Sequence, residues 1–190
     1  FPAFTTKALE DAREQQLQQV VDHLLGRQGD YRDLFTTSRT MLTSNLAGLY
    51  GIPVNAQASQ WVAHEFSPKD QRAGFLTQIG FLAQHAHPGR SSPTLRGKAL
   101  REIMLCQPVP PPPPNVDFSL LDDTHGILHT ARERLEVHNT ERTCRGCHAI
   151  TDPIGLGLEN FNGAGQFRLT ENGVLIDPAG NLDQVGFTTA

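Results

Sequence analysis

The sequence contains only three cysteines, one tryptophan and no apolar run long enough to cross a membrane. Two of the cysteines belong to one short motif, so we do not expect a disulfide framework to carry the fold. The formal net charge of −4 argues against a nucleic-acid partner and favours a basic docking partner. No basic, apolar leader opens the chain. We therefore expect a mature product or part of a longer polypeptide.

Glycine (17) and proline (13) are frequent, whereas apolar residues make up only 38% of the chain. This composition predicts long loops and a modest amount of sheet. Apolar residues at helical spacing predict helices at about residues 5–25, 38–50, 67–82, 93–104 and 127–139. Residues 53–66 are expected to form a loop. We expect Cys106 to be buried.

Three local signals indicate where helices begin or end and where the chain turns. Gly51 followed by Pro53 predicts a helix end, and Ser92-Pro93 predicts a helix start. Asn172-Gly173 lies between two short apolar runs and predicts a small C-terminal β-hairpin. The expected fold class is therefore mainly α.

The segment Cys144-Arg145-Gly146-Cys147-His148 is the clearest chemical signal in the chain. This C-x-x-C-H spacing is the attachment signature of a c-type haem, in which the two thiols hold the porphyrin and the histidine binds iron. We expect one covalently attached haem c, with Cys144, Cys147 and His148 as its residues. Such attachment takes place outside the cytoplasm, so we expect a periplasmic location or the extracellular face of a bacterial membrane.

Two other chemistries use paired cysteines. Structural zinc needs four ligands, and a set built from Cys144, Cys147, His125 and His129 is arithmetically possible but has the wrong order for a zinc finger. A thioredoxin-type redox motif needs a βαβ context that the sequence does not predict. Haem is therefore the preferred interpretation.

The surroundings of the motif resemble a known family. Four parts of the sequence are similar to planctomycete-type cytochrome domains, which are secreted domains of unknown function. These parts are the segment from Cys144 to Arg168, residues 72–78, residues 87–98 and the proline run that follows them. Residues 29–53 resemble the tail of the helical domain that precedes them. The resemblance implies a helical c-type cytochrome-like haem domain at 67–190, which includes the polyproline stretch 108–114, and a helical segment at 1–66. It also implies flanking domains in a longer protein.

Pro110 to Pro114 must be extended as polyproline II. A stiff spacer is the favoured interpretation, and a ligand for an aromatic groove is the alternative.

Further residues are expected to support the haem. The carbonyl of Pro153 is the predicted hydrogen-bond partner of the proximal histidine. His87 is the predicted sixth ligand, with His85, Met104, Met41 and an open site as alternatives. Three arginines are predicted to pair with the propionates: Arg90, Arg96 and Arg168.

The expected function is electron transfer by a mono-haem module, with redox protein partners in a larger assembly. One alternative is a peroxidase-like enzyme with an open sixth site. The other alternative is a structural subunit in which haem stabilises the fold and the proline run binds a partner protein.

Overall fold

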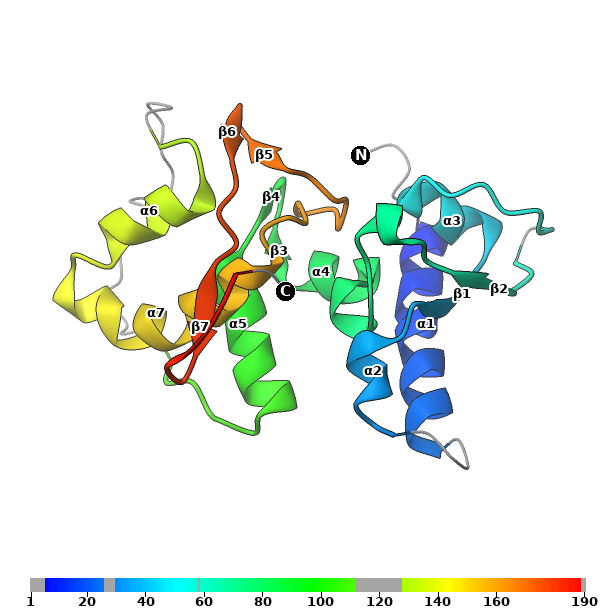
Figure 1. The fold of residues 1–190 in the computed structure, drawn as a ribbon, viewed down its shortest axis with the longest axis horizontal. Helices are drawn as coiled ribbons and strands as arrows, with labels where there is room; N and C mark the ends of the chain where they lie inside the picture. The colour runs from blue at the N-terminus through cyan, green and yellow to red at the C-terminus, as the bar shows by residue number, and fades with distance from the viewer. Residues whose placement is uncertain (1–5, 26–29, 58, 112–127, 189–190) are drawn as a thin grey trace. The chain divides into compact units, whose positions relative to one another are not determined.

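The computed structural model describes residues 6–25, 30–57, 59–111 and 128–188. The described chain is mainly helical, with four two-stranded antiparallel sheets (Figure 1). It divides into two compact units, one of residues 1–84 with 164–167 and the other of residues 85–163 with 168–190. The first unit extends beyond the domain boundary expected at residue 66. No described helix combines the length and apolar character needed to span a bilayer.

The first unit is built on the long helix α1. Its elements are α1 (Thr6–Leu25), α2 (Asp33–Thr36), β1 (Arg39–Leu42), α3 (Ser44–Tyr50), β2 (Val62–Glu65), the 3-10 turns η1 (Pro68–Asp70) and η2 (Phe75–Thr77), and α4 (Ile79–Gln84). Strand β1 pairs with β2, and both α3 and α4 pack on α1. The apolar core is formed by Ala8, Ala12, Leu42, Leu46, Ala47, Leu49 and Ile79.

Helix α1 confirms the first predicted helix, but it buries a different face from the one its leucines suggest. Leu17 and Leu25 are exposed, whereas the buried stripe contains small and polar residues: Ala8, Asp11, Ala12, Gln15 and Gln19. These polar groups have partners. The Thr43 hydroxyl donates to Asp11 at 2.6 Å, and the Gln15 amide donates to Thr40 Oγ1 at 2.8 Å. Buried polar side chains thus anchor α1 to β1 and to the start of α3.

The helix predicted over 38–50 is wrong in its first half. Residues 39–42 form strand β1, because β2 lies beside them and supplies their hydrogen-bonding partners. The helix begins only after Thr43, whose hydroxyl accepts from Leu46 N at 3.2 Å as an N-cap. Its end is as predicted, since Gly51 adopts the left-handed conformation with φ +67°. Residues 53–66 were expected to form a loop, but Val62–Glu65 is a strand and Phe66 after it is buried.

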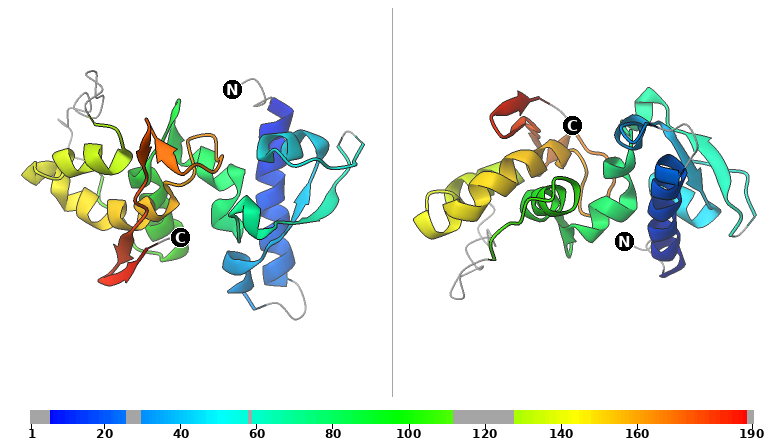
Figure 2. Two further views of the ribbon diagram at one scale, coloured as in Figure 1. Left: turned by 45° about the horizontal axis from the view of Figure 1, so that its top comes forward. Right: turned by 90° about the horizontal axis from the view of Figure 1, so that it is seen from below.

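The second unit is centred on two helices that lie side by side (Figure 2). Its elements are β3 (Ala86–His87), β4 (Arg90–Ser91), α5 (Pro93–Ala99), the π-helical turn η3 (Leu100–Met104), α6 (Ala131–His138), α7 (Arg142–Gly155), the 3-10 turn η5 (Leu156–Leu158), β5 (Thr170–Glu171), β6 (Val174–Leu175), β7 (Gly180–Leu182) and β8 (Val185–Phe187). Among the described elements, helices α5 and α7 make the most extensive contact.

Several predictions for this unit are confirmed. Ser92 caps α5 by accepting from Leu95 N, with Pro93 in its first turn. Asn172 and Gly173 have positive φ between β5 and β6, as a two-residue hairpin turn requires. Cys106 differs from expectation, because it is exposed and has a φ of +52°. His125 and Pro112–Pro114 lie outside the described residues.

Two glycines allow α5 and α7 to approach closely. A Cβ added to Gly97 would lie 1.9 Å from the carbonyl oxygen of Thr151, and one added to Gly155 would lie 1.8 Å from that of Pro93. Both obstacles are backbone atoms of the facing helix, which cannot move aside cheaply. The crossing therefore depends on the absence of side chains at these positions.

We predict that Gly97→Ala lowers the free energy of unfolding by about 3 kcal/mol, because the added methyl group forces the helices apart. Gly146→Ala on α7 is the matched control, since nothing lies within 4 Å of its added Cβ. Urea unfolding followed by circular dichroism checks both. Equal stability of the Gly97→Ala variant and the wild type would contradict the close crossing.

Candidate functional site

The C-x-x-C-H motif occupies the first half of helix α7. Residues three and four positions apart lie on the same side of a helix, so Cys144, Cys147 and His148 share one face. Both cysteines are free and partly exposed, and Cys147 Sγ lies 3.6 Å from the carbonyl oxygen of Pro110, in the proline run. The structure thus brings together the three residues predicted to hold the cofactor.

The ring of His148 is held from one side by Asp152, one turn further along α7. His148 Nδ1 lies 2.8 Å from Asp152 Oδ2, and the Asp152 side chain is 3% exposed. A carboxylate can only accept here, so Nδ1 carries the proton and Nε2 is left as the nitrogen that can bind iron. The structure therefore gives Asp152 the role predicted for Pro153, whose carbonyl oxygen lies instead against Gly180 of β7.

Asp152 is itself fixed by the neighbouring helix. The Thr94 hydroxyl of α5 donates to Asp152 Oδ1 at 2.8 Å, and the Thr151 hydroxyl approaches the same oxygen at 3.2 Å. Sequence reasoning missed both Asp152 and Thr94. The spacing of His148 and Asp152, four residues apart, was an available signal.

A second imidazole lies next to His148. His138, the last residue of α6, is buried, and the two ring centroids are 4.7 Å apart at an interplanar angle of 77°. Burial lowers the pKa of His138, with a smaller contribution from His148. A cavity of about 190 Å³ adjoins His148 between α6, α7 and β7. It is below the roughly 300 Å³ at which small-molecule pockets begin.

The donor set fits a c-type haem. Two free thiols and an imidazole lie on one helix face, and the imidazole has its other nitrogen hydrogen-bonded to a carboxylate, which is one of the usual partners of metal-ligating histidines. Within the described ranges, no three His, Cys, Asp or Glu side chains are arranged to hold a metal ion.

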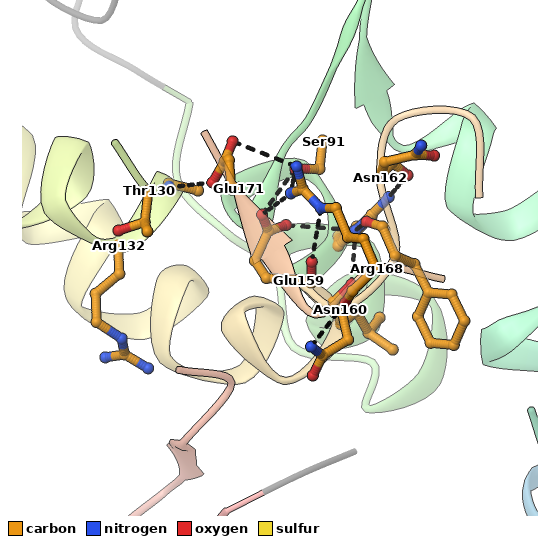
Figure 3. A network of polar contacts seen from close by, with 12 residues as sticks. Ser91, Thr130, Arg132, Glu159, Asn160, Asn162, Arg168 and Glu171 are labelled. Atoms are coloured by element: carbon orange, nitrogen blue, oxygen red, sulfur yellow. Dashed lines mark hydrogen bonds and ion pairs between the residues drawn. The ribbon is translucent and has the colours of Figure 1, made fainter. Parts of the chain in front are cut away.

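Two of the other predicted residues, Arg96 and Arg168, contact Glu159 beyond the opposite end of α7, and Figure 3 shows Arg168 beside Glu159. The hairpin β3–β4, which carries His87 and Arg90, is linked to this region by the Ser91 hydroxyl, which donates to Glu159 Oε2 at 2.7 Å. Gly155, where α7 ends, is about 10 Å from His148 along the helix axis. Arg96 and Arg168, which pair with Glu159, thus lie beyond the end of α7, about two helical turns after His148.

Arg96 and Arg168 hold the buried carboxylate of Glu159. Arg96 Nη1 is 3.3 Å from Glu159 Oε1, and Arg168 Nη2 is 3.2 Å from Oε2. Arg168 also pairs with Glu171, which in turn pairs with Arg134. Burial raises the pKa of Glu159, although both arginines and Ser91 oppose this.

Arg96 has a structural role that differs from the predicted pairing with a propionate. Its side chain is fully buried, and its guanidinium donates to the carbonyl oxygens of Leu158, Phe161 and Asn162 at 2.7–2.8 Å. Burial lowers its pKa to about 10, which leaves it charged at neutral pH. Arg168 is likewise engaged with Glu159, so the two guanidinium groups stabilise the turn after α7.

We predict that Arg96→Met destabilises the chain by about 3–5 kcal/mol, because it leaves three buried carbonyl oxygens without their donor and removes one of the two arginines that pair with the buried Glu159 carboxylate. Lys98→Met on the same helix is the control, because Lys98 is partly exposed and forms only a surface ion pair with Glu102. Chemical denaturation measures both. A cost below 1 kcal/mol for Arg96→Met would refute the role of the network.

A known protein family matches most of the second unit. Residues 72–171 match PSCyt3, described as a protein of unknown function (DUF1588), and residues 1–52 match PSD4, a protein of unknown function (DUF1592). Comparisons with curated proteins and with solved structures gave no match. Neither family description names a haem site. Because the first match covers more than half of the sequence, the chain belongs to the PSCyt3 family of proteins of unknown function.

Proposed function

We propose that this chain is a mono-haem c-type cytochrome module that transfers electrons within a larger extracytoplasmic assembly. The observation that carries the proposal is the state of His148 in its C-x-x-C-H motif: Nδ1 is bound to a buried carboxylate, and both neighbouring thiols are free. When bound, haem c supplies an iron centre that takes up and releases one electron.

The residues of the chain have separate tasks in this proposal. Cys144 and Cys147 hold the porphyrin covalently, and His148 Nε2 binds iron. Asp152 keeps the proton on Nδ1 and makes the imidazole a stronger donor, which favours ferric iron. Thr94 holds Asp152 from α5, so the orientation of the ligand is set by helix packing.

The net charge of the chain indicates the kind of redox partner that it binds. The net charge of −4 favours a basic redox partner, because complementary charge speeds the encounter. A periplasmic or extracellular location is part of the proposal, since covalent attachment at this motif takes place there. His87 stays a prediction for the sixth ligand.

The proposal is tested by expressing the chain in a bacterium that attaches haem c in its periplasm. We expect one haem per chain in a pyridine haemochrome assay, retained through acid–acetone extraction, and its loss in a Cys144→Ala/Cys147→Ala variant. Cys106→Ala is the matched control and should load fully. A colourless wild type, or colour that the extraction removes, would refute covalent attachment.

Optical spectra of the same haem-loaded protein distinguish an electron carrier from a peroxidase-like enzyme. A low-spin reduced spectrum that ignores carbon monoxide supports the carrier, whereas high-spin iron with peroxide turnover supports the enzyme. A low-spin spectrum unchanged in His87→Ala would exclude His87 as sixth ligand.

We predict that Asp152→Asn raises the reduction potential by about 60 mV, which corresponds to a tenfold loss in the preference for ferric iron. The physical reason is the loss of the negative charge that strengthens His148. Potentiometric titration of the haem-loaded variant measures the shift. Asp177→Asn removes an exposed carboxylate and should leave the potential unchanged; a potential unaltered in Asp152→Asn would contradict the role of Asp152.

A further inference from the structure

The contact between His138 and His148 has no role in the function proposed above. His138 ends α6 and is 4% exposed, so the chain places a polar aromatic ring in a buried position directly before the turn that leads to the cysteine motif. Its ring meets that of His148 at 77°, with 4.7 Å between centroids, which is the edge-to-face arrangement that aromatic rings prefer.

The distance between the two imidazole rings determines whether His138 could bind the same metal ion as His148 from the opposite side. Two imidazoles bound to opposite sides of one metal ion have their nitrogens about 4 Å apart, since each metal–nitrogen bond is about 2.0 Å. Their ring centres are further apart still, because each centre lies behind its nitrogen. A centroid separation of 4.7 Å leaves no room for an ion between the rings. His138 is therefore a neighbour of the iron ligand rather than a second ligand opposite to it.

The hydrogen bond to Asp152 restrains His148 at one atom only. It selects the proton position and the direction of Nδ1, but the ring can still rock about the line through that bond. A flat ring packed edge-to-face against the imidazole blocks this motion. The two contacts come from different elements, Asp152 from α7 and His138 from the end of α6.

We propose that His138 is a positioning residue that sets the plane of the His148 imidazole and thereby its orientation toward the haem. The inference rests on the proposed function and deepens it. It assigns the effect to the shape of the His138 ring, so an aromatic residue without ionisable nitrogens should replace it.

The experiment compares His138→Ala, His138→Phe and Val137→Ala, the last being an exposed neighbour on α6. In the haem-free chain, the proton resonances of His148 should lose their ring-current shift in His138→Ala, keep a ring-current shift of the same sign in His138→Phe, and stay at their wild-type values in Val137→Ala. In the haem-loaded chain, the spread of the haem methyl resonances should change in His138→Ala and be restored in His138→Phe.

Each outcome is decisive. If His138→Ala leaves the His148 resonances or the haem methyl spread unchanged, or if His138→Phe fails to restore them, the proposal is overturned. Should His138→Ala not fold by circular dichroism, the comparison of His138→Phe with wild type still decides whether ring shape suffices. A wild type that carries no haem refutes the proposed function, and the haem-free spectra then decide the ring contact separately.

Discussion

The close crossing of α5 and α7 is the constraint on which the second unit depends. Gly97 and Gly155 let the two backbones touch, and this contact brings the Thr94 hydroxyl to Asp152 and the Arg96 guanidinium to the turn after α7. A wider crossing would lose both sets of hydrogen bonds at once. The close packing at Gly97 and Gly155 thus determines which polar groups of the second unit can form hydrogen bonds with one another.

Two polar centres result, one at each end of α7. At the first half of the helix, a carboxylate held by α5 fixes the imidazole of His148, and the face of the helix presents two thiols. Beyond its end, Glu159 is buried between Arg96 and Arg168 and ties the β3–β4 hairpin to the segment that follows η5. The second centre stabilises the fold, whereas the first contains the residues to which we assign the proposed haem.

The sequence predicted α5 after Ser92 and the hairpin at Asn172-Gly173, because those signals are local. The helix predicted over 67–82 was wrong over most of its length, since residues 68–70 and 75–77 form 3-10 turns and α4 begins only at Ile79. Residues 39–42 were also mistaken for helix, since only the neighbouring strand β2 makes this segment extended. The cysteine motif was visible in the sequence, whereas Asp152, Thr94 and His138 were not assigned, because their roles arise when α5 and α6 pack beside α7. The sequence identified Arg96 as a charged residue but did not predict that it is buried. It can be buried because the carbonyl oxygens around it accept its hydrogen bonds.

The central claim is that His148 binds the iron of a covalently held haem while Asp152 holds its other nitrogen. Anomalous diffraction at the iron edge from crystals of the loaded chain tests it most directly. The account predicts a single iron peak within bonding distance of His148 Nε2, with Asp152 still at Nδ1 and both sulfurs joined to the porphyrin. An iron peak bound to another side chain, or none, would contradict it.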